Sequence, residues 1–312
     1  MVSVIICSRN PRSLDALKIN IHETIGTKYE LIIIDNSENH YSIFSAYNKG
    51  MEMSRYPYLC FIHEDILFHS GNWGKAVSKH LEDPSCGLIG VCGGFLLPRI
   101  PSSWSFYYFT EYILQSDNRH SKPVYKNTAV YNKDHEKPVI ALDGVFLGIR
   151  KELFEKIRFD DTHYKGFHFY DTDICLQAYF QGFENRAVND ILIEHFSKGF
   201  QGRQWVENSL TYWKKWGDKM PVSSIKFSED DLQKKEYGYM TGIYMKRMIR
   251  TDYSTQEIIR TLLPFLKHVD QKNERIFCLK MSIRIFLTRL AKKPLSLIHA
   301  ASKVHVCDGN DS

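Results

Sequence analysis

The sequence lacks several patterns that define common classes of protein. Its seven cysteines, an odd number, include no C-x-x-C pair, so neither a disulfide framework nor a thiolate zinc site is predicted. No stretch approaches the roughly 18 uninterrupted apolar residues of a membrane-spanning helix. No basic leader precedes the apolar opening MVSVIICS, so we expect no signal peptide and a cytoplasmic location.

The sequence also lacks a large excess of positive or negative charge. The net charge is only +5, and no basic patch lies beside the motifs described below, so nucleic acid is not an expected partner. The hydrophobic content of 43% and the charged content of 25% are those of an ordinary globular protein. A chain of 312 residues can hold one large α/β domain with an appendage.

Short apolar runs alternate with segments of helical character near the start of the chain. Predicted strands are VSVIICS, YELIIIDN, PYLCFI and CGLIGVCGG, and helices are predicted near residues 11–25, 42–54 and 71–82. This alternation indicates right-handed crossovers within a largely parallel sheet. Ligands of such sheets bind beyond the carboxyl ends of the strands, which is where Asp35 and the triplet His63-Glu64-Asp65 fall.

The alternating pattern is interrupted between Arg99 and Pro138, where we expect a long, lid-like excursion. Order then resumes with VIALDGVFLGIRKELF, and DILIEHF predicts a strand that ends at His195. After Pro221 strand formers become rare, and helices are predicted near residues 229–249, 255–268 and 273–291. The expected domains are therefore residues 1–220 and a helical extension, residues 221–312.

The segment YPYLCFIHEDILF places three ionisable residues directly after a buried strand. Charge at such a place is costly unless something uses it, and carboxylate oxygens are the ligands that Mg²⁺ and Mn²⁺ prefer. A solvated junction between strand and loop is the structural alternative. Asp35 likewise suits either a ligand contact or an Asp-Asn-Ser turn.

Four segments together resemble a known family, and they span roughly residues 1–217. The segments are VSVIICSRN, ELIIIDNSE, AYNKGMEMSRYPYLCFIHEDILF and GFHFYDTDICLQAYFQGF. In this order they resemble the inverting nucleotide-sugar glycosyltransferases of family two, which have the GT-A fold. The resemblance implies an α/β protein with a GT-A type mixed, mostly parallel sheet flanked by helices, followed here by a helical C-terminal extension.

The resemblance also implies roles for particular residues. Asp65, with His195, is the expected site for Mn²⁺ or Mg²⁺, while His63 stands where the family has an acid. Residues expected to contact the nucleotide-sugar donor, which we expect to be uridine-linked, are Ser8, Asp35, Asn48, Glu64 and Asp143. Structural alternatives remain open for Asn48 on a helix surface, Asp143 in a turn and His195 at a strand end.

Asp171 is the expected catalytic base of the segment YDTDICLQA, where the resemblance implies an acid facing the acceptor. Tyr170 stands where the family has the first acid of a pair, and Asp173 suits the N-terminus of the following helix. Both aspartates could instead serve only as helix caps. The expected activity is metal-dependent, inverting transfer of a sugar to a glycan or glycolipid acceptor.

Two other functions remain open at this point. A nucleotidyltransferase would carry a glycine-rich phosphate loop near the first strand, and C-S-R-N-P-R contains no glycine. A catalytically inactive carbohydrate-binding or scaffold protein on the same fold is compatible with the departures at His63 and Tyr170.

The C-terminal segment RIFCLKMSIRIFLTRLAKK carries only basic charges. On a helix its apolar residues fall on one face, with Lys280, Arg284 and Thr288 on the opposite face; the apolar set is Ile276, Leu279, Ile283, Phe286 and Leu290. This pattern is typical of a helix on an anionic membrane surface, here the inner face, and packing onto the catalytic domain or self-association is the alternative.

Overall fold

The computed structural model describes residues 1–116, 122–127, 136–197, 199–266 and 274–290. The chain forms two compact units, Met1–Leu232 and Gln233–Ser312. The division into functional domains at residue 220 stays a prediction, because compactness alone does not show where one function ends. All the candidate site residues belong to the first unit.

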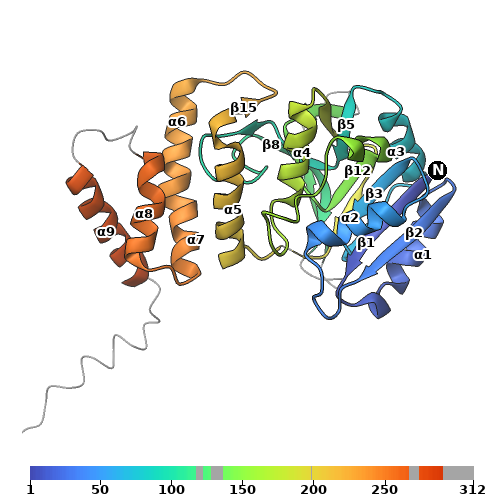
Figure 1. Ribbon diagram of the computed structural model, residues 1–312, viewed down its shortest axis with the longest axis horizontal. Helices are drawn as coiled ribbons and strands as arrows, with labels where there is room; N and C mark the ends of the chain where they lie inside the picture. Colours follow the sequence, from blue (N-terminus) through green and yellow to red (C-terminus); the bar gives the residue numbers. More distant parts are fainter. Residues whose placement is uncertain (117–121, 128–135, 198, 267–273, 291–312) are drawn as a thin grey trace, which may run out of the picture. The chain divides into compact units, whose positions relative to one another are not determined.

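The first unit is built on a mixed sheet in which most strands run in the same direction (Figure 1). Parallel pairing joins β1 to β2 and β3, and β12 lies antiparallel between β3 and β5. The predicted mixed, mostly parallel sheet is therefore confirmed. In spatial order the strands are β10 (Glu136–Val139), β13 (Glu184–Val188), β5 (Cys86–Gly90), β12 (Phe146–Arg150), β3 (Tyr58–Ile62), β1 (Val2–Ser8) and β2 (Tyr29–Asp35).

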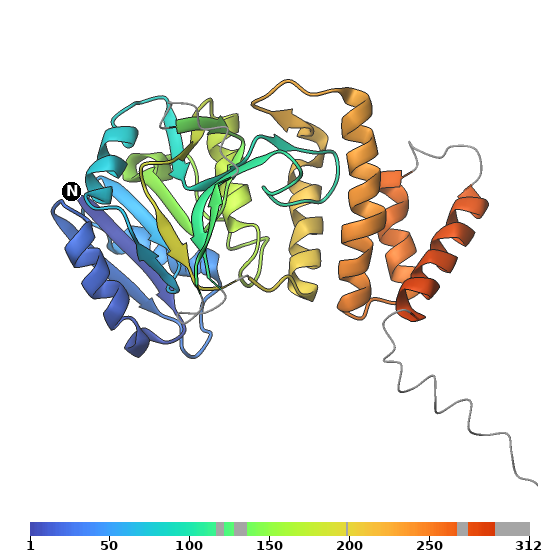
Figure 2. The same cartoon turned by 180° about the vertical axis from the view of Figure 1, so that it is seen from behind.

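Helices cover both faces of this sheet (Figures 1 and 2). On one face, α1 (Asp15–Thr24) and α3 (Trp73–Leu81) pack against the apolar side of β1 to form the main core. On the other face lie α2 (Ile43–Met53) and α4 (Tyr170–Phe180). A Cβ at Gly50 of α2 would lie 2.3 Å from Cγ2 of Ile5, so this glycine lets α2 approach β1 closely.

A second sheet contains strands from the region predicted to be an excursion. Its order is β11 (Ala141–Leu142), β6 (Cys92–Gly94), β8 (Phe109–Gln115), β14 (Ile193–His195) and β4 (Ile66–Phe68), with β9 (Val124–Asn127) also paired to β8. The prediction of an irregular excursion between Arg99 and Pro138 is wrong for β8, β9 and β10, whereas residues 99–108 form no helix or strand. The strand signal is weak because β8 buries only Thr110 and Ile113, while its pairing with β6, β9 and β14 stabilises it.

The second sheet also determines where His195 lies. Strand β14 pairs antiparallel with β4, and His195 stands opposite Ile66. Ile66 directly follows Asp65 in the chain, and the amide of Phe196 donates to the carbonyl of Asp65 at 3.0 Å. Residues 65 and 195, far apart in the sequence, are therefore held side by side by main-chain hydrogen bonds.

The remaining elements of the first unit are short, apart from one helix. This helix, α5 (Arg203–Trp216), buries its aromatic face against the unit through Trp205, Tyr212 and Trp216. The short elements are 3-10 turns η1 (Pro11–Ser13), η2 (Lys151–Glu155) and η3 (Gly217–Lys219), and the paired strands β7 (Leu96–Leu97) and β15 (Val222–Ser223).

The C-terminal unit is helical. Helix α6 (Glu229–Gly238) begins in the first unit and ends in the second. The C-terminal unit then contains a π-helical turn η4 (Tyr239–Tyr244), α7 (Met245–Arg250), α8 (Thr255–Leu266) and α9 (Glu274–Leu290). Helix α9 buries Met281 and Ile285 but exposes Ile283, Phe286 and Leu287. Within the described residues, none of the helices combines the length and the apolar composition needed to cross a bilayer.

The structure shows which side of α9 packs. Ile283 and Phe286, from the apolar face expected either on a membrane surface or in packing, are 51% and 61% exposed, whereas Met281 and Ile285 are buried. The other residues of that face are Ile276, Leu279 and Leu290, whose side chains are not among those that the structure describes. The helix has apolar residues on more than one side, which is why periodicity alone did not identify the packed side.

Candidate functional site

A cavity of about 470 Å³ opens at the carboxyl ends of β1 and β3. Its walls also include the start of α2, residues 166–168 and residues that follow β14. The triplet His63-Glu64-Asp65 and His195 all line it. Polar groups from separate segments thus converge on one concavity, which is the common arrangement of a ligand site in an α/β protein.

Three side chains in this cavity form a cluster that could hold a metal ion. Nδ1 of His63 lies 3.9 Å from Oδ1 of Asp65, and Nε2 of His195 lies 3.5 Å from the same oxygen. One ligand atom from each of the three residues lies within 4.8 Å of the others. These side chains are 15%, 35% and 13% exposed respectively, so they can converge on a cation that still reaches the cavity.

The charge states of the cluster fit a cation. Burial, reinforced by the neighbouring His195, lowers the pKa of His63, which favours the neutral imidazole that binds metal. Burial alone would raise the pKa of Asp65, but the hydrogen bond from His195 and the nearby histidine charges hold this pKa well below its usual value. Two imidazole nitrogens and one carboxylate are a chemically suitable donor set for a divalent transition metal.

Glu64 connects the triplet to the end of β1. Its Oε2 accepts a hydrogen bond from Oγ of Ser8 at 2.5 Å, and its carboxylate also lies within 3.3 and 3.4 Å of the amides of Arg9 and Asn10. The structure thus brings together two of the predicted donor-binding residues, Ser8 and Glu64. The hydrogen bond between them holds the loop after β1 against the loop after β3.

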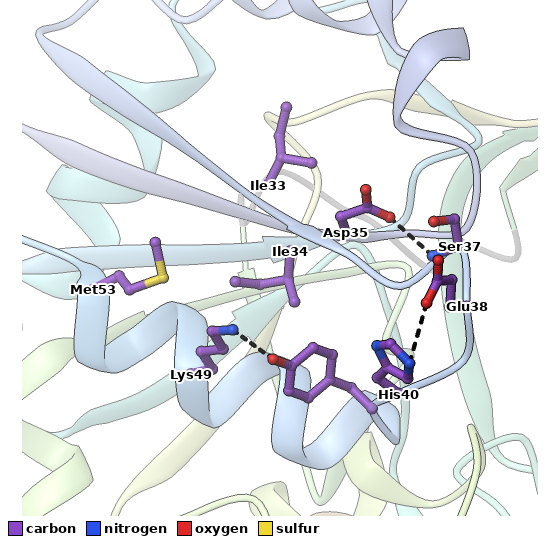
Figure 3. A pocket seen from close by; sticks show the side chains of 9 residues that line it. Ile33, Ile34, Asp35, Ser37, Glu38, His40, Lys49 and Met53 are labelled. Atoms are coloured by element: carbon purple, nitrogen blue, oxygen red, sulfur yellow. Dashed lines mark hydrogen bonds and ion pairs between the residues drawn. The ribbon is translucent and has the colours of Figure 1, made fainter.

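Asp35 lies at the tip of β2, opposite Ser8 in the sheet register, but it does not line the cavity of the triplet. It lines a neighbouring cavity of about 340 Å³, and Tyr41 contributes to the walls of both cavities. The exposed carboxylate of Asp35 accepts the amide of Ser37 at 2.9 Å (Figure 3). This hydrogen bond lowers the pKa of Asp35 and keeps the carboxylate ionised.

Two other predicted donor contacts make structural hydrogen bonds instead. Asn48 is 3% exposed, lies outside the cavity lining, and donates from Nδ2 to the carbonyl of Phe159 at 2.8 Å. Its amide tethers α2 to a loop, so the structure offers no support for a ligand contact. Asp143 accepts the amide of Val145 at 2.7 Å within its turn and also lies outside that lining.

Asp171 is the second residue of α4 and faces the turn that contains Gly144. Its Oδ1 accepts the amide of Thr172 at 2.7 Å, and its Oδ2 accepts the amide of Gly144 at 3.1 Å. Burial, followed by the negative charge of Asp143, raises the pKa of Asp171 to about 7. A carboxylate with this pKa can take up a proton near neutral pH, although Asp171 does not itself line the cavity of the triplet.

Asp173 has a structural role that is larger than the expected helix-terminal charge. It is 1% exposed and accepts hydrogen bonds from Tyr164 at 3.1 Å, Trp216 at 2.7 Å and Lys215 at 3.0 Å. Of these donors, Lys215 and Trp216 belong to α5, so one buried carboxylate connects α4 to α5.

Removing this carboxylate should be strongly destabilising. We expect Asp173→Ala to lower the free energy of unfolding by about 3–5 kcal/mol, because the buried donors of Tyr164 and Trp216 lose their partner and Lys215 keeps only Asp160. Urea unfolding measures the change. Asp15→Ala, at an 80% exposed side chain paired with Lys18, is the matched control and should change stability by less than about 1 kcal/mol. Equal, small effects for both variants would contradict this role.

Sequence reasoning missed two functional candidates in the site. His63 was treated as a departure from an acidic motif, yet it is part of the cluster. A usable signal was present, because His63 and Asp65 stand only two residues apart, directly after a buried strand. The hydroxyl of Tyr170, 2.8 Å from Nε2 of His63, had no signal in the local sequence.

Comparisons with known proteins agree with this fold. A sequence model of a family described as "Glycosyltransferase like family" matches residues 3–214. The streptomycin biosynthesis protein StrF of Streptomyces griseus is 25% identical over 196 residues, which cover 60% of this chain and 65% of StrF. The chain therefore spans just under two thirds of that relative.

Solved structures are similar at lower identity. GalNAc-T7, solved with UDP, GalNAc and Mn²⁺, is 11% identical with a TM-score of 0.50, over 86% of this chain and 56% of that one. The mannosyltransferase PcManGT of Pyrobaculum calidifontis, solved with GDP-Man and Mn²⁺, is 12% identical with a TM-score of 0.42, over 96% and 79%. The first of these shares the fold. Because the family model matches more than half of the chain, this protein belongs to the glycosyltransferase-like family.

Proposed function

We propose that this protein transfers a sugar from a nucleotide-sugar donor to a hydroxyl of a glycan or glycolipid, with inversion and with a requirement for a divalent cation. The observation that carries the proposal is the cluster of His63, Asp65 and His195 in a cavity at the carboxyl ends of parallel strands. The family to which the chain belongs makes glycosyl transfer the natural use of such a site.

The cluster fits a cation by its chemistry. A divalent cation bound there would neutralise charge on the diphosphate leaving group. Of the two cations expected from the sequence, the donor set favours Mn²⁺, because two of the three ligands are imidazoles and Mg²⁺ prefers oxygen. The residues that would hold it are His63 through Nδ1, Asp65 through its carboxylate and His195 through Nε2.

The nucleotide would be held by the neighbouring strand ends. Asp35 offers an ionised carboxylate to N–H groups of the base, and a uridine-linked donor would supply such a group. Ser8 and Glu64, already joined at 2.5 Å, keep the two loops at the ribose side in place. The pair lies between the tip of β2 and the metal cluster along the sheet edge.

Asp171 would accept the proton of the acceptor hydroxyl as the sugar is transferred in a single displacement. The amides of Thr172 and Gly144 hold the carboxylate in one orientation. Within the described residues, Oδ2 receives one hydrogen bond, from Gly144, so it keeps a lone pair for the proton. The bond from the sugar to the diphosphate breaks as the bond to the acceptor oxygen forms.

Exposed aromatic rings would serve the acceptor. Phe167 and Phe200 line the cavity and are 42% and 84% exposed, so each presents an uncovered ring surface. Such rings suit the apolar faces of sugars, as in other ligand cavities lined by aromatic side chains. Contact of α9 with an anionic membrane that carries a glycolipid acceptor stays a prediction, supported by exposed Ile283, Phe286 and Leu287.

A thermal-shift screen tests the proposed ligands. The protein is heated with UDP, GDP or ADP, each with Mn²⁺, with Mg²⁺ or with a chelator. We expect UDP with Mn²⁺ to raise the unfolding temperature most, because a ligand at 100 times its dissociation constant stabilises by about 2.7 kcal/mol. If no nucleotide raises it in any combination, the proposed donor class is wrong.

A further inference from the structure

Tyr170 opens α4 within an aromatic cluster, and its ring is 3% exposed. Its hydroxyl lies 2.9 Å from the carbonyl oxygen of Gly144 and 2.8 Å from Nε2 of His63. The preceding residue, Phe169, has a φ of +71°, which is unusual for a non-glycine residue, and its ring packs against Trp205 and Tyr212. The helix start that carries the hydroxyl is therefore held firmly in place.

The hydrogens around this hydroxyl can be assigned by counting donors. A tyrosine hydroxyl has one hydrogen, and a carbonyl oxygen can only accept. The neighbouring Tyr47 hydroxyl donates to the carbonyl of Ile62 at 3.3 Å. The hydroxyl of Tyr170 therefore donates to Gly144, and its oxygen accepts from an N–H at Nε2 of His63. In a neutral imidazole with a hydrogen on Nε2, the lone pair is on Nδ1, the atom that lies 3.9 Å from Asp65.

We propose that Tyr170 is a positioning residue that holds His63 in the tautomer and orientation needed to bind the divalent cation through Nδ1. This inference rests on the proposed metal site. It assigns to this tyrosine the task that a carboxylate or carbonyl performs behind many metal-binding histidines, namely to accept the hydrogen of the nitrogen that does not bind. The ring of Phe167, with its centroid 5.3 Å from that of His63, limits tilting of the imidazole.

Gly144 belongs to the same hydrogen-bonded arrangement as Tyr170 and His63. A Cβ at this position would lie 2.0 Å from the hydroxyl oxygen of Tyr170, so any larger residue would displace the hydroxyl. The carbonyl of Gly144 takes the hydroxyl hydrogen, and its amide holds Asp171 at 3.1 Å. The turn thus positions the hydroxyl behind His63 and the proposed base on its other side.

The test compares Mn²⁺ binding by the parent and by Tyr170→Phe, measured from the free Mn²⁺ signal in electron paramagnetic resonance. Loss of the hydroxyl should weaken Mn²⁺ roughly 10–100-fold, the usual effect of removing a partner behind a metal-binding histidine. Gly144→Ala should weaken Mn²⁺ in the same direction, because it moves the hydroxyl. Tyr164→Phe is the matched control: it removes another buried hydroxyl, one bonded to Asp173, and should bind Mn²⁺ as the parent does.

A second readout follows the tautomer itself. Nitrogen-15 spectra of the metal-free protein should show the hydrogen of His63 on Nε2 in the parent and on both nitrogens, in exchange, in Tyr170→Phe. A merely structural role of the ring would leave the tautomer unchanged. If the parent binds no Mn²⁺, the metal site of the proposed function is wrong. If the parent binds Mn²⁺ and Tyr170→Phe binds it equally well, only the positioning role is overturned.

Discussion

Replacing Asp171 with asparagine is expected to slow sugar transfer by roughly 10²–10⁴-fold, because an amide of the same shape cannot take the proton from the hydroxyl of the acceptor substrate. The affinity for the donor should change little. The carboxylate of Asp171 contacts Gly144 and Thr172 and is not one of the three metal-cluster residues. Transfer rate and donor affinity, measured on the same preparation, separate the two effects.

The pH dependence of this prediction has opposite signs for rate and stability. The pKa of Asp171 is raised from its ordinary 3.8 to about 7, so transfer should rise with pH and level off above about 7, where the base is ionised. Between pH 3.8 and about 7, the carboxyl of Asp171 keeps its proton in the folded state but has lost it in the unfolded chain. Stability contributed by the protonated carboxyl is therefore lost as pH rises towards 7. Asp171→Asn should remove both dependences.

Asp143→Asn is the informative companion variant. The charge of Asp143 helps to raise the pKa of Asp171, so its removal should shift the rising limb of the rate profile to lower pH. The midpoint of the profile is the readout, whatever happens to the maximal rate. Near-parental turnover in Asp171→Asn would mean that the base is another residue, and His195 would be the next candidate.

Loss of the metal cluster should abolish the cation-dependent part of nucleotide binding. In Asp65→Ala, calorimetry should find the same UDP affinity with Mn²⁺ as with a chelator, because the one carboxylate shared by both histidines is gone. His63→Ala and His195→Ala should behave in the same way. In the parent, Mn²⁺ should increase UDP affinity clearly.

Two controls make this result specific. Asp35→Ala should weaken UDP with or without Mn²⁺, because Asp35 lines a different cavity from the cluster. His22→Ala removes an exposed histidine of α1 that bonds to Tyr29 and should leave both affinities unchanged. A Mn²⁺-dependent gain that survives in Asp65→Ala would place the cation elsewhere.

The sequence predicted the fold of the first unit well. Apolar β-branched runs and short intervening helices predicted the parallel strands, and the edge at which Asp35 and Asp65 fall follows from parallel pairing. The strands of residues 99–138 were missed because strand β8 buries few side chains and is stabilised by its neighbours. Local propensity cannot report such long-range pairing.

Side-chain roles were harder to predict than positions. Asn48 lies in α2 as expected, but its amide is used by the carbonyl of Phe159, a residue far away in the sequence. Asp173 lies at the expected helix start, but the donors Trp216 and Lys215 come from α5 and make it a buried hub. The role of Tyr170 depends on a hydroxyl that spans two segments, which no local pattern encodes.

The most direct test of the central claim is the anomalous scattering of Mn²⁺ in crystals grown with UDP and Mn²⁺. We expect one strong anomalous peak in contact with Nδ1 of His63, the carboxylate of Asp65 and Nε2 of His195, with the diphosphate of UDP completing the coordination. These three atoms already lie within reach of one cation. A peak away from these atoms, or UDP bound at full occupancy with no anomalous peak in the cavity, would contradict the proposed Mn²⁺ site.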